Sequence, residues 1–233
     1  PVGRKPIKTI AKPLSKVDEA TESLKRLMEN GEKAYWVCPL IEESEKIDLA
    51  AAEDRFASLK NIYGNKVGLV HGRMSIEERE ETMREFKYGN KNILVATTVI
   101  EVGIDVPDAT FMIIEHSERF GLSQLHQLRG RVGRSDKASS CLLLYRSPLG
   151  ENAKKRIETL RETDDGFIIA EEDLILRGAG EVLGTKQSGL PYFKIANLST
   201  DRDLVETARN DSNYIIENNN IRNKTKLSQI LSH

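Results

Sequence analysis

The stretch Asn92-Ile-Leu-Val-Ala-Thr-Thr98 holds an uninterrupted apolar run that ends in two threonines. A short, continuous run of this kind is typical of a strand buried on both faces of a sheet. Other stretches of the same character occur along the chain, at residues 34–41, 66–72, 110–116 and 139–146. The sequence therefore predicts a sheet built from buried strands.

Helical stretches separate these strands, and they are predicted at residues 16–30, 48–62, 76–88 and 123–133. Ser15 is expected to cap the first helix, and Ser75-Ile-Glu-Glu78 matches a capping box at the start of the third. Residues 6–14 are expected to be extended. The alternation of strands and helices predicts an α/β fold, with a parallel sheet covered by helices on both faces.

The pattern changes after Pro148. Residues 150–183 are expected to form two helices broken near Asp164-Asp165-Gly166, where the aspartates suit a helix-capping turn, while Glu171-Glu172-Asp173 reads as a solvated face. Residues 201–218 are typical of an amphipathic helix, followed by a loosely held polar tail. We expect three parts: an α/β domain over 1–149, a helical hairpin and loop over 150–200, and a helix and tail over 201–233.

Bulk composition is that of a globular domain, with 35 Lys and Arg, 36 Asp and Glu, and a net charge of −1. Near-neutrality does not exclude nucleic-acid binding, because a local basic cluster is enough. No apolar run has the length of a membrane span. Cys38 and Cys141 are expected to be buried free thiols in a reducing cytoplasm. The first residue is a proline, and no signal-peptide pattern follows it. Position 1 is therefore expected to be a cut within a longer chain.

The strongest chemical signal is Gln127-Leu-Arg-Gly-Arg131-Val-Gly-Arg134. Arginine keeps its charge and offers a forked donor to phosphate oxygens, and glycine permits close approach. On the predicted helix, Arg131 and Arg134 would share one face, so that both could reach one polyphosphate. The alternative is a solvated basic helix end.

Two strand ends carry further candidates. Ala96-Thr97-Thr98 leads into Val102-Gly103-Ile-Asp105-Val-Pro, and the threonines offer donors to a nucleic-acid phosphate; the alternative is a plain turn. Val70-His71-Gly72-Arg73-Met74 precedes a capped helix, which suits a phosphate. His71 has no His or Cys partner at metal-ligand spacing, so a polar loop residue is the simpler interpretation. Trp36, in a buried run, is expected to belong to the core rather than to stack on a base.

Together these motifs resemble the second RecA-like domain of superfamily 2 helicases, whose sixth motif reads Gln-x-x-Gly-Arg-x-Gly-Arg or close to it. The stretches 167–180 and 183–189 resemble the translocation motif shared by RecG-type branched-DNA helicases and the transcription-repair coupling translocases. Residues 3–7 and 34–45 resemble the linker and the fourth motif of the RecG family, which favours that family.

The resemblance implies roles for individual residues. Arg131 and Arg134 would be arginine fingers for ATP, with Gln127, Gly103 and Asp105 near the nucleotide. DNA-backbone contacts would fall to five residues of the strand-end loops: His71, Gly72, Arg73, Thr97 and Thr98. Arg177 and Gln187 would couple the hairpin to the motor. The implied partners are branched or forked DNA and the wedge domain and first motor domain of the same protein, and no membrane.

Some expected parts of such a motor are missing from the 233 residues. There is no Gly-x-x-x-x-Gly-Lys-Ser/Thr loop and no Asp-Glu box after an apolar strand. ATP and Mg²⁺ would therefore be held mainly by the first motor domain. Two alternatives stay open: a transcription-repair coupling translocase, and a non-catalytic nucleic-acid-binding module, which needs no paired arginines.

Overall fold

The computed structural model describes residues 5–39, 45–97, 106–177 and 207, and nearly all of these belong to the first of two compact units, Pro1–Asp173 and Leu174–His233. The strands are β1 (Lys8–Pro13), β2 (Lys33–Val37), β3 (Val67–Val70), β4 (Ile93–Ala96), β5 (Ala109–Ile114) and β6 (Ser140–Tyr145). The α-helices are α1 (Val17–Glu29), α2 (Glu45–Tyr63), α3 (Ile76–Tyr88), α4 (Leu122–Arg129), α5 (Glu151–Glu162) and α6 (Gly166–Arg177). Short 3₁₀ turns are η1 (Leu14–Lys16), η2 (Gly64–Lys66) and η3 (Ser117–Arg119).

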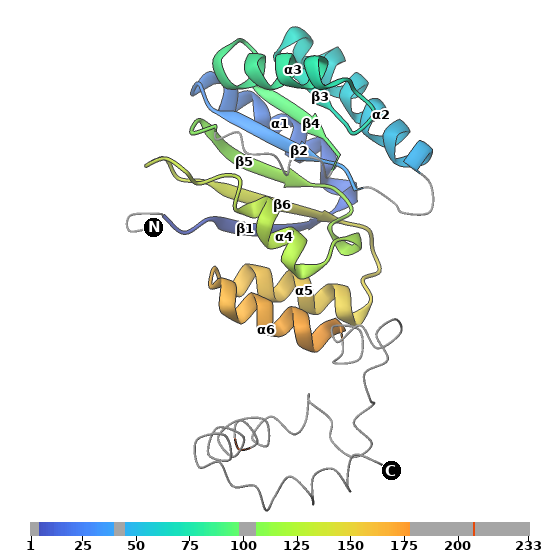
Figure 1. Ribbon diagram of the computed structural model, residues 1–233, viewed down its shortest axis with the longest axis vertical. Coiled ribbons are helices and arrows are strands. Elements are labelled where there is room, and N and C mark those ends of the chain that lie inside the picture. Colours follow the sequence, from blue (N-terminus) through green and yellow to red (C-terminus); the bar gives the residue numbers. More distant parts are fainter. Residues whose placement is uncertain (1–4, 40–44, 98–105, 178–206, 208–233) are drawn as a thin grey trace, which may run out of the picture. The chain divides into compact units, whose positions relative to one another are not determined.

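The strands form one parallel sheet in the order β1-β6-β5-β2-β4-β3 (Figure 1). All five residues of β2, in the middle of the sheet, are buried. Residues 8–13, predicted only as extended, form the edge strand β1, which pairs with β6. The predicted α/β fold with a parallel sheet is confirmed.

Side chains alternate between the two faces of the sheet, so each face has its own core. Trp36 points to the face where Leu24 of α1 and Leu59 of α2 pack. Tyr35, the next residue along β2, meets Phe86 of α3, with ring centroids 5.0 Å apart. Helices thus cover both faces, and Figure 1 shows α1 behind the strands and α4 in front of them. The prediction that Trp36 belongs to the core is confirmed, since its side chain is 0% exposed.

Helix starts follow the sequence in one case and depart from it in another. At α3 the capping box is present: Ser75 Oγ accepts from Glu78 N, and Glu78 Oε2 accepts from Ser75 N. The expected cap at Ser15 is wrong, because Ser15 lies inside η1. Lys16 occupies the N-cap of α1 without a side-chain hydrogen bond, so the 3₁₀ turn leads directly into the helix.

Helix α4 ends at Arg129, four residues before the predicted end at 133. Gly130 follows the helix, and Gly133 has a φ of +74°, a backbone region that an α-helix does not use. The prediction of a short basic helix over 123–133 is therefore wrong in its last four residues. Arg131 and Arg134 therefore lie on a turn rather than on one face of a helix.

The predicted hairpin is present as α5 and α6, with a break at 163–165. Asp165 caps α6, because its Oδ1 accepts from Phe167 N at 2.8 Å. The solvated face expected at residues 171–173 is wrong for Asp173, which is 7% exposed. Its Oδ2 accepts from Ser123 Oγ of α4 at 2.5 Å, so this carboxylate joins the hairpin to the domain.

A second connection between α4 and the hairpin is the buried guanidinium of Arg129, which is 2% exposed. Its Nη1 donates to Leu160 O at 2.6 Å and to Thr163 O at 3.1 Å, and it pairs with Asp164 Oδ1 at 3.0 Å. Its Nη2 lies 3.1 Å from His126 Nδ1, which accepts this hydrogen bond. Arg129 thereby fixes the end of α4 against the end of α5.

We expect Arg129→Ala to lower the free energy of unfolding of the chain by about 2–4 kcal/mol, because the buried Leu160 and Thr163 carbonyls lose their donor. Urea unfolding measures this loss. Arg161→Ala is the matched control: this arginine lies on α5 with an exposed side chain, and its loss is expected to change stability by less than about 0.5 kcal/mol. Equal stabilities of the two variants would contradict the anchoring role of Arg129.

Candidate functional site

The loop after β3 holds three of the predicted DNA contacts. Gly72 and Arg73 are exposed and His71 is half-buried. His71 Nδ1 accepts from Arg73 N at 3.2 Å, which makes this histidine a loop-shaping residue. The same segment leads directly into the capped N-terminus of α3, where backbone N–H groups and the helix dipole favour an anion.

The end of β4 brings Thr97 beside this loop. Its backbone N donates to Val70 O at 3.3 Å, across the two neighbouring strands. Thr97 is 2% exposed, and its Oγ1 has no hydrogen-bond partner among the residues that the structure describes. A buried hydroxyl in this state is a good candidate for a ligand contact. Thr98, Gly103 and Asp105 lie outside the described residues.

A cluster that the sequence did not reveal lies at the end of β5. Glu115, 8% exposed, accepts from Trp36 Nε1 at 2.6 Å and forms an ion pair with Arg55 of α2. The Arg55 guanidinium lies 5.0 Å from the centroid of the Trp36 ring. These contacts fix the ends of β2 and β5 next to the candidate DNA loops. The isolated Glu in an apolar run was the available signal, because a buried carboxylate needs a cation nearby.

The turn after β5 is fixed by a second acid, the half-buried Glu118. His116 has a φ of 49°, in the left-handed region. Glu118 accepts from His116 Nδ1 and from Arg146 N, and its carbonyl accepts from Arg156 of α5. Burial acts to raise the pKa of Glu118, but the hydrogen bonds from His116 and Arg146 outweigh it and lower that pKa. The turn therefore contacts α5 directly and leads into α4.

The two predicted catalytic arginines lie on the segment that follows α4, residues 130–136, which we call the arginine turn. Arg131 is half-buried and Arg134 is exposed, whereas Arg129 just before them is buried. Gln127, the predicted nucleotide contact on α4, is exposed. A sequence signal for Arg129 did exist: it lies four residues after Leu125, on the buried face of the helix.

The arginine turn lies beside the start of β1, because Gly133 contacts Ile7. The candidate DNA contacts, in contrast, follow the carboxyl ends of β3 and β4. The structure therefore groups His71, Arg73 and Thr97 at one end of the sheet and leaves Arg131 and Arg134 near the other. Arg177 is the last residue of α6, and Gln187 lies outside the described residues.

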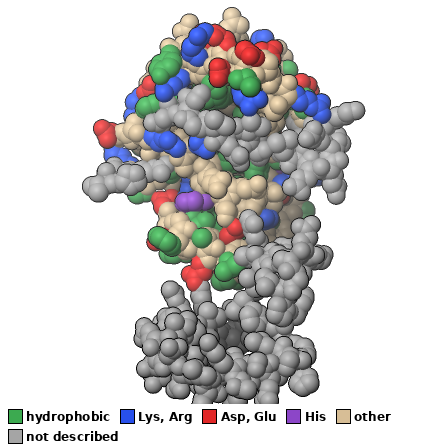
Figure 2. Space-filling view, in the orientation of Figure 1, with side chains coloured by type: hydrophobic (Ala, Val, Ile, Leu, Met, Phe, Trp, Pro, Cys, Tyr) green, Lys and Arg blue, Asp and Glu red, His purple; other side chains and the backbone are tan. Residues whose placement is uncertain are grey.

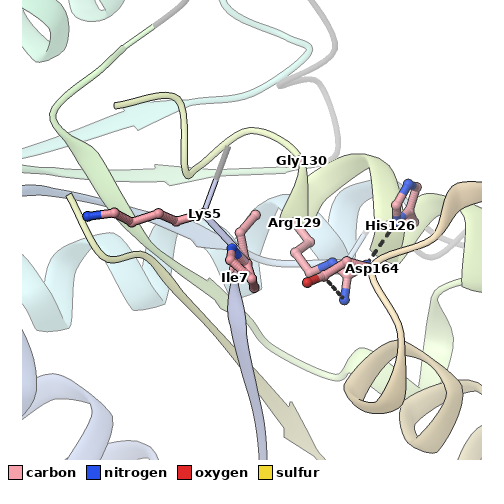
Figure 3. Close-up of a pocket in the computed structure, with 7 residues that line it drawn as sticks. Lys5, Ile7, His126, Arg129, Gly130 and Asp164 are labelled. Atoms are coloured by element: carbon pink, nitrogen blue, oxygen red, sulfur yellow. Dashed lines mark hydrogen bonds and ion pairs between the residues drawn. The ribbon is translucent and has the colours of Figure 1, made fainter. Parts of the chain in front are cut away.

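A pocket of about 270 Å³ borders the first half of the arginine turn (Figure 3). Lys5 and Ile7 lie on one side of it, and His126, Arg129 and Asp164 lie on the other. Gly130 and Pro6 complete the lining. The pocket thus separates the segment before β1 from the hairpin.

Other chemistry finds little support in the described part of the chain. Cys38 and Cys141 are buried and unpaired, as predicted. Burial raises the pKa of the Cys38 thiol, and it raises that of Cys141 to about 12, so both stay protonated at neutral pH. No cluster of three potential metal ligands occurs among the described residues. None of the described helices is both long and apolar enough to cross a membrane.

Basic and acidic side chains intermingle on the upper part of the face that Figure 2 shows, in keeping with the net charge of −1. The domain as a whole therefore does not attract a polyanion through a positive electrostatic field over this face. Local groups such as the arginine turn and the N-terminus of α3 are better suited to that task.

Comparisons with known proteins show the family of the chain. The family of helicase conserved C-terminal domains matches residues 16–136, and domain 3, C-terminal, of the ATP-dependent DNA helicase RecG matches residues 163–231. The RecG of Acidithiobacillus ferridurans is 53% identical over 206 residues, which cover 88% of this chain and 30% of that protein. The RecG of Escherichia coli (strain K12) is 48% identical over 219 residues, 93% of this chain and 32% of that protein.

Solved structures give the same result. A RecG bound to a three-way DNA junction superposes with a TM-score of 0.68 at 45% identity, over 88% of this chain and 26% of that one. Domain 2 of the DEAD-box helicase Mss116p, with a TM-score of 0.52 and 18% identity over 72% of this chain and 67% of that one, shares the fold alone.

The fold is thus the RecA-like fold of helicase C-terminal domains. The chain spans about a third of the length of the curated relatives that it matches. The family match covers more than half of the chain, and the match over 163–231 favours RecG over the transcription-repair alternative. The chain therefore belongs to the family of helicase conserved C-terminal domains, and it is similar to the RecG helicases over about a third of their length.

Proposed function

We propose that this chain is the C-terminal motor half of a RecG-type ATP-dependent DNA helicase, which unwinds and remodels branched DNA such as stalled forks and Holliday junctions in recombination and repair. The RecG structure on a three-way DNA junction, similar over 88% of this chain, supports DNA as the partner. The domain boundaries proposed here are 1–149 for the RecA-like domain, 150–200 for the hairpin and its loop, and 201–233 for the C-terminal helix and tail.

One observation carries this proposal: the three arginines of one short motif differ in their surroundings. Arg129 is buried and bound to carbonyl oxygens, while Arg131 and Arg134 remain accessible on the turn that follows. Exposed arginines are common on protein surfaces, so the placement supports the proposal through the motif in which it occurs: Arg131 is half-buried and Arg134 is exposed directly after an anchored arginine. The arrangement suits a fixed base from which two cations extend toward a bound polyphosphate.

Arg131 and Arg134 would act as arginine fingers on ATP held by a first motor domain of the same protein. They would stabilise the charge on the phosphoryl oxygens as the bond to the leaving diphosphate breaks. Gln127, Gly103 and Asp105 would contact the same nucleotide. Mg²⁺ would be bound mainly by the first motor domain, because this chain lacks a P-loop and an Asp-Glu box.

DNA would lie at the opposite end of the sheet, along the loops after β3 and β4. His71, Gly72, Arg73, Thr97 and Thr98 would contact the phosphate backbone, which positions DNA without reading its sequence. Arg177 and Gln187 would couple the hairpin to the stroke of the motor. A wedge domain of the same protein would hold the fork, and we place the protein in the cytoplasm with its DNA substrate.

We expect Arg131→Ala and Arg134→Ala, made in the full-length protein, each to lower kcat for ATP hydrolysis by ~10³-fold or more. The Kd for ATP should change far less, because each finger acts mainly on the transition state. Arg161→Ala, an exposed arginine of α5, serves as the control and should keep kcat within about twofold. A loss of ATP affinity with unchanged kcat would show that the finger assignment is incorrect.

The chain alone, without a first motor domain, is expected to hydrolyse ATP no faster than background. The reason is that no P-loop is present in its 233 residues to hold the β- and γ-phosphates. A steady-state phosphate-release assay with the purified chain, with and without forked DNA, checks this expectation. Turnover at the rate of the full-length protein would overturn the proposal that this is half of a motor.

A further inference from the structure

The segment just before β1, residues 5–7, lies against the arginine turn. Ile7 is 8% exposed. A methyl group placed on Gly133 would lie 3.0 Å from Ile7 Cγ1 and 3.2 Å from Ile7 Cδ1. Contacts that short leave no room for a side chain at position 133, so Ile7 packs directly on the backbone of the turn.

The shape of the turn depends on the same glycine. Gly133 has a φ of +74°, a conformation that residues with a side chain rarely adopt. This left-handed residue turns the chain between Arg131 and Arg134, and it is the point that Ile7 covers. Ile7 thus packs on the residue whose backbone conformation sets the relative position of Arg131 and Arg134.

Two hydrogen bonds extend this contact along the chain. Lys5 Nζ donates to Asp136 O at 2.5 Å, and Lys8 N donates to Ser139 O at 3.1 Å. The segment before β1 therefore contacts the arginine turn at Gly133 and Asp136, and β1 continues the contact at Ser139 beyond the turn. Neither Lys5 nor Ile7 belongs to the nucleotide or DNA contacts proposed above.

The first half of the turn is held differently. Arg129 anchors its start to the end of α5, and the pocket of about 270 Å³ separates Gly130 from the segment before β1 (Figure 3). Arg129 Nη1 also donates to Thr9 Oγ1 of β1 at 3.3 Å, and Val132, inside the turn, is buried. Residues 5–7 therefore contact the turn at Gly133 and Asp136, whereas the start of the turn is held by α5 and by Thr9 of β1.

We propose that residues 5–7 act as a clamp that positions Arg131 and Arg134, with Ile7 as the main positioning residue and Lys5 as its support. The inference rests on the proposed function, and on the resemblance of residues 3–7 to a linker, by which this segment would connect the chain to a first motor domain. Relative movement of the two motor domains then pulls on the clamp and shifts the arginines. Through these residues, the connection between the domains would control the rate of ATP hydrolysis.

The test uses the full-length protein with Ile7→Ala, which removes both contacting carbon atoms. We expect kcat for DNA-stimulated ATP hydrolysis to fall roughly 10- to 100-fold, because a small misplacement of a catalytic group has effects of this size. The KM for ATP should stay within about threefold of the parent value. Amide hydrogen exchange at residues 130–136 should rise by about tenfold or more, a readout that does not require activity.

Matched variants separate positioning from general stability. Ile10→Ala removes the same side chain from β1, where Ile10 packs on the main core, and should leave kcat and exchange of the turn near the parent values. Ile7→Val keeps the branched Cβ and should restore most of the activity. Should Ile7→Ala fail to fold, Lys5→Ala, on an exposed residue, should still raise exchange at 130–136 and lower kcat by about threefold.

The clamp is refuted if Ile7→Ala leaves kcat and exchange unchanged, or if Ile10→Ala has the same effects. In either case, large losses of turnover in Arg131→Ala and Arg134→Ala would leave the proposed function in place. Unchanged turnover in those two arginine variants would instead refute the proposed function itself, and the exchange measurement would still report whether Ile7 holds the turn.

Discussion

Two carbonyl oxygens at the end of α5, those of Leu160 and Thr163, accept hydrogen bonds from the buried guanidinium of Arg129. From one position, the forked, planar guanidinium contacts these two oxygens and also Asp164 and His126. The compact ammonium of a lysine would not substitute for it. With Ser123 and Asp173 at the other end of α4, this contact fixes the hairpin against the helix that leads into the arginine turn. Because Arg131 and Arg134 follow α4 directly, the contacts of α4 with the hairpin help to set their position.

The sheet separates two kinds of candidate contact. The loops after β3 and β4 present a helix N-terminus and a buried hydroxyl at the carboxyl ends of the strands, while the arginine turn lies near the start of β1. A motor needs such a separation, because nucleotide and DNA must act on the same domain without competing for one surface. The hairpin is joined to both ends of α4, through Asp173 and Ser123 at one end and through Arg129 at the other.

Local patterns were sufficient for most of the fold. The apolar runs predicted the central strands, and the capping box placed the start of α3 correctly. Contacts between distant residues were not visible in the sequence: Glu115 with Trp36, Ser123 with Asp173, and Arg129 with the end of α5. The apolar residues around Glu115 and Arg129 were a signal that these two side chains are buried, but nothing local identified their partners. The prediction of a helix over 130–133 is wrong because the helix ends before Gly130, and Gly133 has a positive φ that an α-helix does not use.

The most direct test is a structure of the full-length protein bound to forked DNA, Mg²⁺ and ADP with aluminium fluoride, which imitates the phosphoryl group in transfer. The account predicts guanidinium nitrogens of Arg131 and Arg134 at about 3 Å from the fluoride ligands, with Arg129 still bound to Leu160 and Thr163. It is contradicted if neither Arg131 nor Arg134 reaches the nucleotide, or if Arg129 leaves the hairpin to do so.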